Sequence, residues 1–296
     1  MMGYVFLFAA LMAAITKGYC SKKTSGYVNE YKDAMLFNSI RMVICFVIGL
    51  GVLAVSGKMG FLKINRTVLL ITLLSGAANS AFAVLWLVSL KKGAYMMLDV
   101  FCMLGVLIPI TGCAVFFGEA IEINAVIGMA VLIASVCLVC SYNNTIKQKI
   151  TLSSFIVLLI CGISNGLSDF SQKLFVKLTS DIPISVFNFY TYLFSAIILI
   201  ICFLVLRPHS DNKETFNIKP IIKYVLIMSV CLFLYSYLKT CAAKYLPSAQ
   251  LYPLSQGGGL ILASVMSAVV FHERLTAKAI IGIILSFAAL IIINVL

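Results

Sequence analysis

The stretch VFHERLTAKAIIG, residues 270–282, interrupts two apolar runs with polar groups, and FFGEAIEINAVIG, residues 116–128, does the same. Aligned at an offset of 154 residues, the two stretches share five identities: Phe117 with Phe271, Glu119 with Glu273, Ala125 with Ala279, Ile127 with Ile281, and Gly128 with Gly282. Apolar runs on both sides of a short polar stretch predict a turn between two membrane helices. The chain therefore contains an internal repeat.

Two weaker matches extend this repeat toward the beginning of each half. LFNSIR at 36–41 aligns with VFNFYT at 186–191, at an offset of 150 residues. Ile15 and Gly18 align with Ile163 and Gly166, at an offset of 148 residues. Offsets that grow slowly along the chain are typical of small insertions in loops. The repeat thus predicts two related halves, residues 1–141 and 151–296, joined by a loop at 142–150.

The composition assigns the chain to the membrane proteins. Of its 296 residues, 62% are hydrophobic and 11% are charged, and the mean hydropathy is +1.09. A soluble domain carries about 25% charged residues, so this chain has too little polar surface for a soluble fold. The net charge of +12 comes mostly from Lys and Arg flanking apolar runs, as in membrane proteins, and does not indicate nucleic-acid binding.

Ten segments are long and apolar enough to span a bilayer as helices. They lie at 2–21, 34–56, 67–90, 94–117, 122–141, 151–173, 184–206, 220–242, 248–271 and 276–295. We therefore predict an all-α integral membrane protein with ten transmembrane helices. Because each half contributes an odd number of spans, the second half crosses in the opposite sense. This predicts two inverted five-helix repeats, a construction common in transporters.

The repeated Gly-Glu turn over ten spans resembles the drug/metabolite transporter superfamily, of the EamA type. Arg41, in NSIRMVICF, resembles the arginine often found in that family's second helix. AAKYLPSAQLYPL at 242–254 and SLKKGAYMML at 89–98 resemble the links before its ninth and fourth helices. Two features depart from the family pattern, since His272 replaces a frequent glycine and the mid-helix prolines are displaced to Pro109 and Pro253.

The resemblance implies a central cavity lined by helices 1–4 and 6–9, with helices 5 and 10 as supports. It also implies secondary active transport of a small organic metabolite (an amino acid, amine or drug-like solute) by alternating access, more often export. The resemblance also places both termini in the cytoplasm. The membrane that we expect is the plasma membrane. The count of Lys and Arg disagrees, because 15 of the 22 residues lie on the side of the membrane opposite the termini. The positive-inside rule then predicts that both termini lie outside. The sidedness stays open here.

Polar side chains on the predicted spans are candidates for this cavity. Asn165, Asp169 and Gln172 share one helical face. The full set of candidate cavity residues is Asn79, Trp86, Asp99, Asn165, Asp169, Gln172, Asn188, Tyr235 and Gln256. Isolated polar residues also join helices by hydrogen bonds, at about 0.6 kcal/mol each, and Trp86 fits an interface anchor equally well. The face on the sixth span favours a cavity.

Two carboxylates lie inside predicted spans, where each costs about 2.5–3.5 kcal/mol to insert. Asp99 sits on an apolar helix, which favours its neutral form and makes it a candidate proton carrier. Asp169 has polar neighbours and is a candidate substrate contact. The structural alternative for either is an ion pair with Arg41, Lys17 or Lys173. Lys17 is otherwise expected to extend to a membrane surface.

Other classes of function find little support in the sequence. Glu119 and Glu273 are interpreted as structural turn residues that interact with a helix N-terminus. Neither a nucleotide-binding motif nor a catalytic arrangement appears, so we expect no enzyme activity, no cofactor and no metal. Two alternatives stay open: a carrier of phosphorylated or nucleotide-linked sugars, and a non-transporting receptor or assembly protein. We expect a monomer or homodimer.

Overall fold

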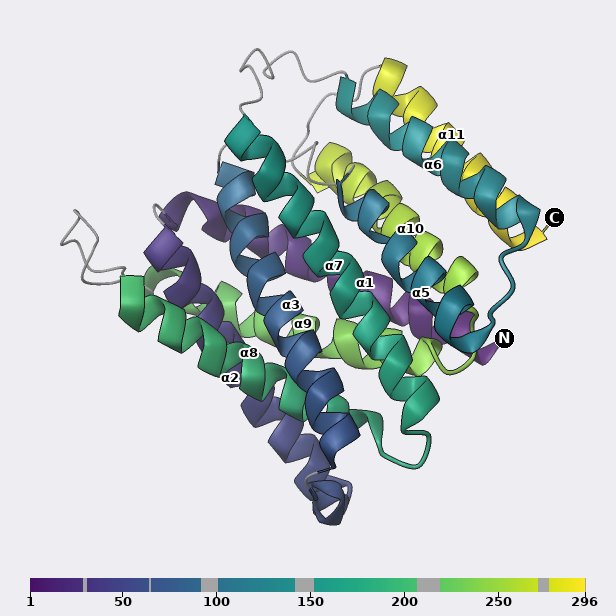
Figure 1. The fold of residues 1–296 in the computed structure, drawn as a ribbon. Coiled ribbons are helices and arrows are strands. Elements are labelled where there is room, and N and C mark those ends of the chain that lie inside the picture. The colour runs from purple at the N-terminus through teal and green to yellow at the C-terminus, as the bar shows by residue number, and fades with distance from the viewer. Residues whose placement is uncertain are drawn as a thin grey trace.

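A computed structural model describes residues 1–28, 31–63, 65–91, 101–141, 152–206, 219–270 and 277–295. Figure 1 shows a bundle of helices, and these described ranges contain no strand. Ten α-helices are defined: α1 (Met2–Thr24), α2 (Tyr31–Val55), α3 (Arg66–Lys91), α5 (Leu107–Phe117), α6 (Ile123–Ser141), α7 (Leu152–Leu178), α8 (Ile184–Leu206), α9 (Ile222–Ala242), α10 (Ser248–Val270) and α11 (Ala277–Val295). The bounds follow the predicted spans closely because long apolar runs end at polar turns.

The predicted span 94–117 is the exception, since it is not one continuous helix. Residues 101–105 are helical, Val106 forms a turn, and α5 then runs from Leu107 to Phe117. Pro109 explains the break: proline has no N–H to donate, and its ring collides with the carbonyl four residues earlier, that of Gly105. The helix restarts at Leu107, two residues before the proline.

Six helices are long and apolar enough to cross a membrane by length and composition. They lie in α1, α2, α3, α7, α8 and α9. Three shorter apolar stretches, at 101–117, 123–135 and 280–293, accompany them within the described residues. The chain is thus an all-helical, multi-pass membrane protein, while the full count of ten crossings stays a prediction.

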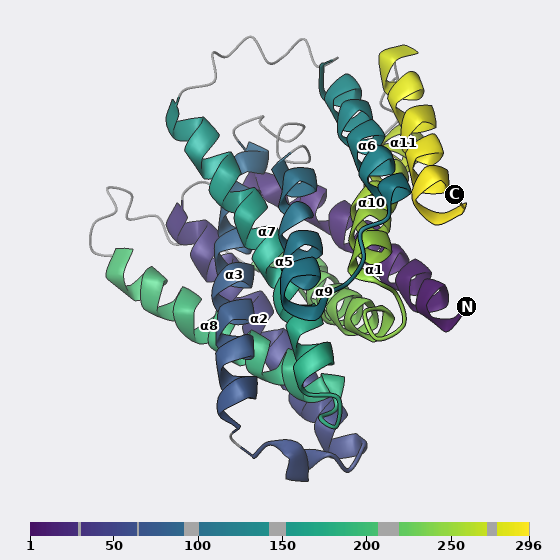
Figure 2. The same cartoon turned by 45° about the vertical axis from the view of Figure 1, so that its right-hand side comes forward.

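Helices of the first half pack mainly against helices of the second half. α1 packs along α9 and α3 along α7, while α2 packs along α8. α6 and α11 pack against each other at one edge of the bundle (Figures 1 and 2). If each half is one repeat, α1 corresponds to α7 and α3 corresponds to α9. The packing of α1 on α9 is then equivalent to the packing of α3 on α7. This pattern is the one expected of two related halves, while the inversion of one half relative to the other stays a prediction. α1 begins and α11 ends at the same end of the bundle (Figure 2).

A close backbone approach in the bundle involves the glycines of GISNG on α7. A Cβ placed on Gly162 would collide with the carbonyl of Phe101, and one on Gly166 with the carbonyl of Gly105. Small residues four apart let membrane helices approach backbone to backbone. This contact fixes α7 against residues 101–105, with Asn165 lying between the two glycines. It therefore sets the position of the polar face of α7.

Candidate functional site

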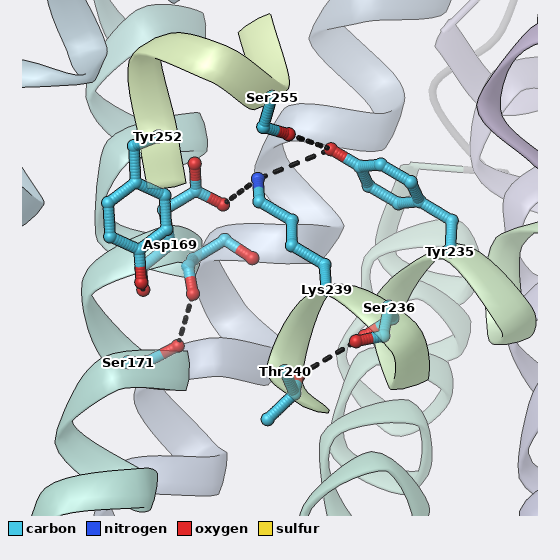
Figure 3. Close-up of polar contacts among 9 residues, drawn as sticks. Asp169, Ser171, Tyr235, Ser236, Lys239, Thr240, Tyr252 and Ser255 are labelled. Carbon is cyan, nitrogen blue, oxygen red and sulfur yellow. Dashed lines mark hydrogen bonds and ion pairs between the residues drawn. The ribbon is translucent and has the colours of Figure 1, made fainter. Parts of the chain in front are cut away.

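A buried ion pair joins α7 to α9. Lys239 Nζ on α9 donates a 2.7 Å hydrogen bond to Asp169 Oδ1 on α7, and the two side chains are 1% and 5% exposed. The Lys239 ammonium also donates to the Tyr235 hydroxyl at 3.2 Å. Figure 3 shows Lys239 reaching between Asp169 and Tyr235. Since Tyr235 and Lys239 are four residues apart on one helix, they share a face.

The third helix at this site is α10. The Tyr235 hydroxyl lies 3.3 Å from the Ser255 hydroxyl (Figure 3), and the Tyr252 hydroxyl donates to the backbone carbonyl of Asp169 at 2.7 Å. The Lys239 ammonium lies 5.4 Å from the ring centroids of both tyrosines, which is within the range of a cation–π interaction. The cation is therefore enclosed by one carboxylate, one hydroxyl and two aromatic faces.

Three polar atoms on α7 have no hydrogen-bond partner among the described residues. They are Asp169 Oδ2, Asn165 Nδ2 and Gln172 Oε1, and all three are buried. A buried polar atom without a partner costs about 1–3 kcal/mol. The α7 face predicted from the sequence thus carries one donor and two acceptors with unused hydrogen-bonding capacity among the described residues.

A partly open cavity of about 570 Å³ lies at one end of the bundle, not around the ion pair. Its lining includes Lys173 and Ala243, which are each four residues beyond a member of the pair. Lys173 Nζ donates to the carbonyls of Ala243 at 3.0 Å and Leu246 at 2.6 Å, just past the end of α9. Lys173 therefore lies one helical turn from the ion pair, between that pair and this end cavity.

Both the sequence and the structure relate this chain to known proteins. Residues 149–295 match the profile of the EamA-like transporter family. The chain belongs to the EamA-like transporter family through this second half. One solved crystal structure superposes with a TM-score of 0.79 at 13% sequence identity, covering 99% of this chain and 96% of the other. At that identity the likeness establishes the fold alone. No curated protein sequence matches the chain. Family membership makes the chain an integral membrane protein of a family of small-solute transporters, which accords with the absence of an enzymatic motif.

Asn188 and Gln256 of this EamA-like transporter lie on helices that adjoin the ion pair. Asn188 on α8 is fully buried, and its Oδ1 accepts a 2.7 Å hydrogen bond from Ser236. Its Nδ2 donates to the Ile184 carbonyl on the same helix. Gln256 follows Ser255 on α10 and is half-buried. Asn188 thus joins α8 to α9 beside Tyr235.

Asn79 and Trp86 on α3 make contacts outside the ion-pair network. Asn79 Nδ2 donates to the Ser195 hydroxyl on α8 at 3.3 Å. Trp86 packs partly buried against a cluster that includes Phe101 and Leu158. Both contacts join helices, which is the structural alternative considered for isolated polar residues. Asp99 and Glu273, the predicted proton carrier and the second turn glutamate, lie outside the described residues.

Glu119 interacts with a helix N-terminus, but not with that of the helix following it. Its Oε2 accepts a 2.9 Å hydrogen bond from the backbone N–H of Ser248, the first residue of α10. Its Oε1 lies 3.1 Å from Lys177 Nζ and 3.5 Å from Lys173 Nζ. Burial raises the pKa of Glu119, but the Ser248 hydrogen bonds and the two lysines outweigh it, so that pKa lies below its ordinary value. Gly118, with a left-handed φ of 63°, ends α5 and makes this turn possible.

Lys239 is a residue of this candidate site that is absent from the residues predicted from the sequence. It lies inside α9, within the predicted span 220–242, and is the partner of Asp169 in place of Arg41, Lys17 or Lys173. Its spacing of four from Tyr235 was the available signal. Lys17 also differs from expectation: its ammonium lies 4.8 Å from the Tyr235 ring centroid, pointing into the bundle and not to a surface.

Proposed function

We propose that this protein is a secondary active transporter of a small organic solute that binds beside the Asp169–Lys239 ion pair. One observation carries the proposal: a buried ion pair adjoins a helix face on which three polar atoms have no partner in the part of the chain that the structure describes. Removing two charges from water costs several kcal/mol per ion, on the order of the attraction that they regain. A pair with spare hydrogen-bonding capacity is better suited to exchanging partners with a solute than to holding helices together.

Alternating access gives the cavity at the end of the bundle a role. Lys173 separates it from the ion pair and is held by Glu119 and by the carbonyls that follow α9. In our proposal this end opens when Lys173 leaves those carbonyls, which joins the cavity to the solute site. The pairing of α1 with α9 and of α3 with α7 provides two equivalent contacts on which the halves can rock.

Direction is proposed from the family resemblance, and coupling from the place of Asp99 in an apolar predicted span. We propose export, with Asp99 as a candidate proton carrier. Asn at position 99 mimics the neutral acid, so Asp99→Asn should abolish proton-driven accumulation while preserving solute exchange. Uphill transport by Asp99→Asn on a proton gradient would exclude Asp99 as the coupling group.

The sugar-phosphate alternative gains one supporting observation. Such a carrier needs several cations in its cavity, and the sequence favoured Arg41 alone for that role, but Lys17 and Lys239 both approach the Tyr235 ring. A receptor on the same scaffold would bind solute without moving it.

A thermal-shift screen of the purified protein tests the proposed site. The compounds are amino acids, polyamines, sugars and nucleotides, each titrated to saturation. We expect at least one to raise the melting temperature, and Asp169→Asn to weaken its apparent affinity at least tenfold. Lys63→Gln, an exposed substitution in the connection before α3, is the matched control. An equal response of Asp169→Asn and wild type would remove this site from the proposal.

A further inference from the structure

The centre of the bundle carries more positive than negative charge in the part of the chain that the structure describes. Lys17 on α1 and Lys239 on α9 lie 4.8 and 5.4 Å from the centroid of the same Tyr235 ring. Arg41 on α2 is close enough to act on the charge of Lys17. Of these three cations, Lys239 has a carboxylate partner, Asp169.

Lys17 and Arg41 have no ion pair with a described residue. Arg41 is 7% exposed, and its Nη1 donates to Asn38 Oδ1 at 2.7 Å. Asn38 in turn donates to the Ala83 carbonyl on α3 at 3.1 Å, so the guanidinium is held in place by a neutral group. Its Nε is buried and has no hydrogen-bond partner among the described residues.

Such an arrangement is unfavourable unless an anion completes it. Charged groups inside a membrane protein pair with one another or face a polar cavity, and three cations with one carboxylate repel one another. A guanidinium with free N–H donors and a nearby ammonium match the oxygens of a carboxylate or phosphate group. Tyr235, held by Lys239 and Ser255, offers an aromatic wall to the organic part of a ligand.

Resting on the proposed transport function, we propose that the solute is an organic anion whose carboxylate or phosphate group binds between Lys17 and Arg41. Asp169 neutralises Lys239 and thereby keeps the anion on the α1–α2 side of Tyr235. The unpartnered Asp169 Oδ2 and Asn165 Nδ2 then face the remaining polar groups of that solute.

The test is a thermal-shift titration of the full-length protein with four probes. Succinate and glycerol 3-phosphate represent the two anion chemistries, and putrescine and glucose represent a cation and a neutral solute. Wild type should be stabilised saturably by at least one anion and by neither control, and the anion that acts identifies the chemistry. Lys17→Gln and Arg41→Gln should each weaken its apparent affinity at least tenfold. Arg41→Lys should recover part of the loss, and Lys63→Gln should bind as wild type does.

The results that would overturn the inference are equally specific. These are no stabilisation by either anion, stabilisation by putrescine or glucose alone, or unchanged anion affinity in both Gln variants. The melting temperature of each variant without probe shows whether it is folded, and Arg41→Lys serves if Arg41→Gln is not. Saturable flux of a cationic solute in liposomes would contradict the anion inference but leave the transport proposal intact. Anion binding without flux of any solute would do the reverse.

Discussion

Lys239 donates a 2.7 Å hydrogen bond to one carboxylate oxygen of Asp169, while the other oxygen, Oδ2, has no partner among the described residues. The pair is therefore charge-balanced but incompletely hydrogen-bonded. This combination separates it from the cluster around Glu119, where both carboxylate oxygens have partners.

Breaking the pair from one side should be worse than removing it altogether. Asp169→Asn or Lys239→Met each leaves one buried charge unpaired, which costs about 3–5 kcal/mol of unfolding free energy. The double variant Asp169→Asn/Lys239→Met leaves none and should be more stable than either single variant. Thermal unfolding in detergent measures all three. Simple additivity of the two single losses would show that the residues do not act as a pair.

The Glu119 carboxylate should make the stability of the protein depend on pH over an acidic range. Because its folded-state pKa lies below the ordinary 4.5, Glu119 contributes stability above pH 4.5 that is lost as the pH falls through the folded-state value. Glu119→Gln should lower stability by about 1 kcal/mol at pH 7. The difference between wild type and Glu119→Gln should then disappear at low pH. A difference that is constant or grows between pH 7 and pH 3 would contradict the assignment.

The glycine contact of α7 should not accept even a methyl group. Gly162→Ala and Gly166→Ala place a Cβ against the backbone of residues 101–105, and overpacking of this kind costs about 1–3 kcal/mol. Gly51 on α2 has nothing within 4 Å of its virtual Cβ, so Gly51→Ala should be neutral or stabilising. Melting temperatures compare the three. Equal effects would mean that α7 does not approach this segment so closely.

Water should reach the polar faces of α7, α9 and α10 but not the outside of α6. In a cysteine-free background, single cysteines at Asn165, Tyr235 and Gln256 should react with a membrane-impermeant thiol reagent. Cysteines at Val126 and Ile127, each 50% exposed on α6, should face lipid and stay unlabelled. The reverse pattern would mean that the cavity has been assigned to the wrong helices.

Helix positions could be predicted from the sequence because a bilayer requires long apolar runs and the turns interrupt them visibly. The break at Val106 was harder to predict, since Pro109 marks a disturbance without saying where the helix restarts. The α7 face of Asn165, Asp169 and Gln172 followed from helical spacing. Their buried state agrees with that face.

The partner of Asp169 could not be predicted, because ion pairs between spans depend on which helices adjoin. The packing of α7 against α9 is a long-range contact that spacing does not encode. Lys239 stands three residues from the end of α9, a position from which a long side chain can reach a surface or the interior equally well. The inward direction of Lys17 was unpredictable for the same reason. Only the tertiary structure shows whether such a side chain points to a surface or to the interior.

Solute counterflow in liposomes containing the purified protein tests the central claim most directly. The solute is whichever compound stabilises the protein in the thermal-shift screen, and Asp169→Asn is measured beside wild type and Lys63→Gln. The account predicts saturable exchange by wild type and Lys63→Gln, and at least tenfold slower exchange by Asp169→Asn. Exchange no faster than in protein-free liposomes, or equal exchange by Asp169→Asn and wild type, would contradict it.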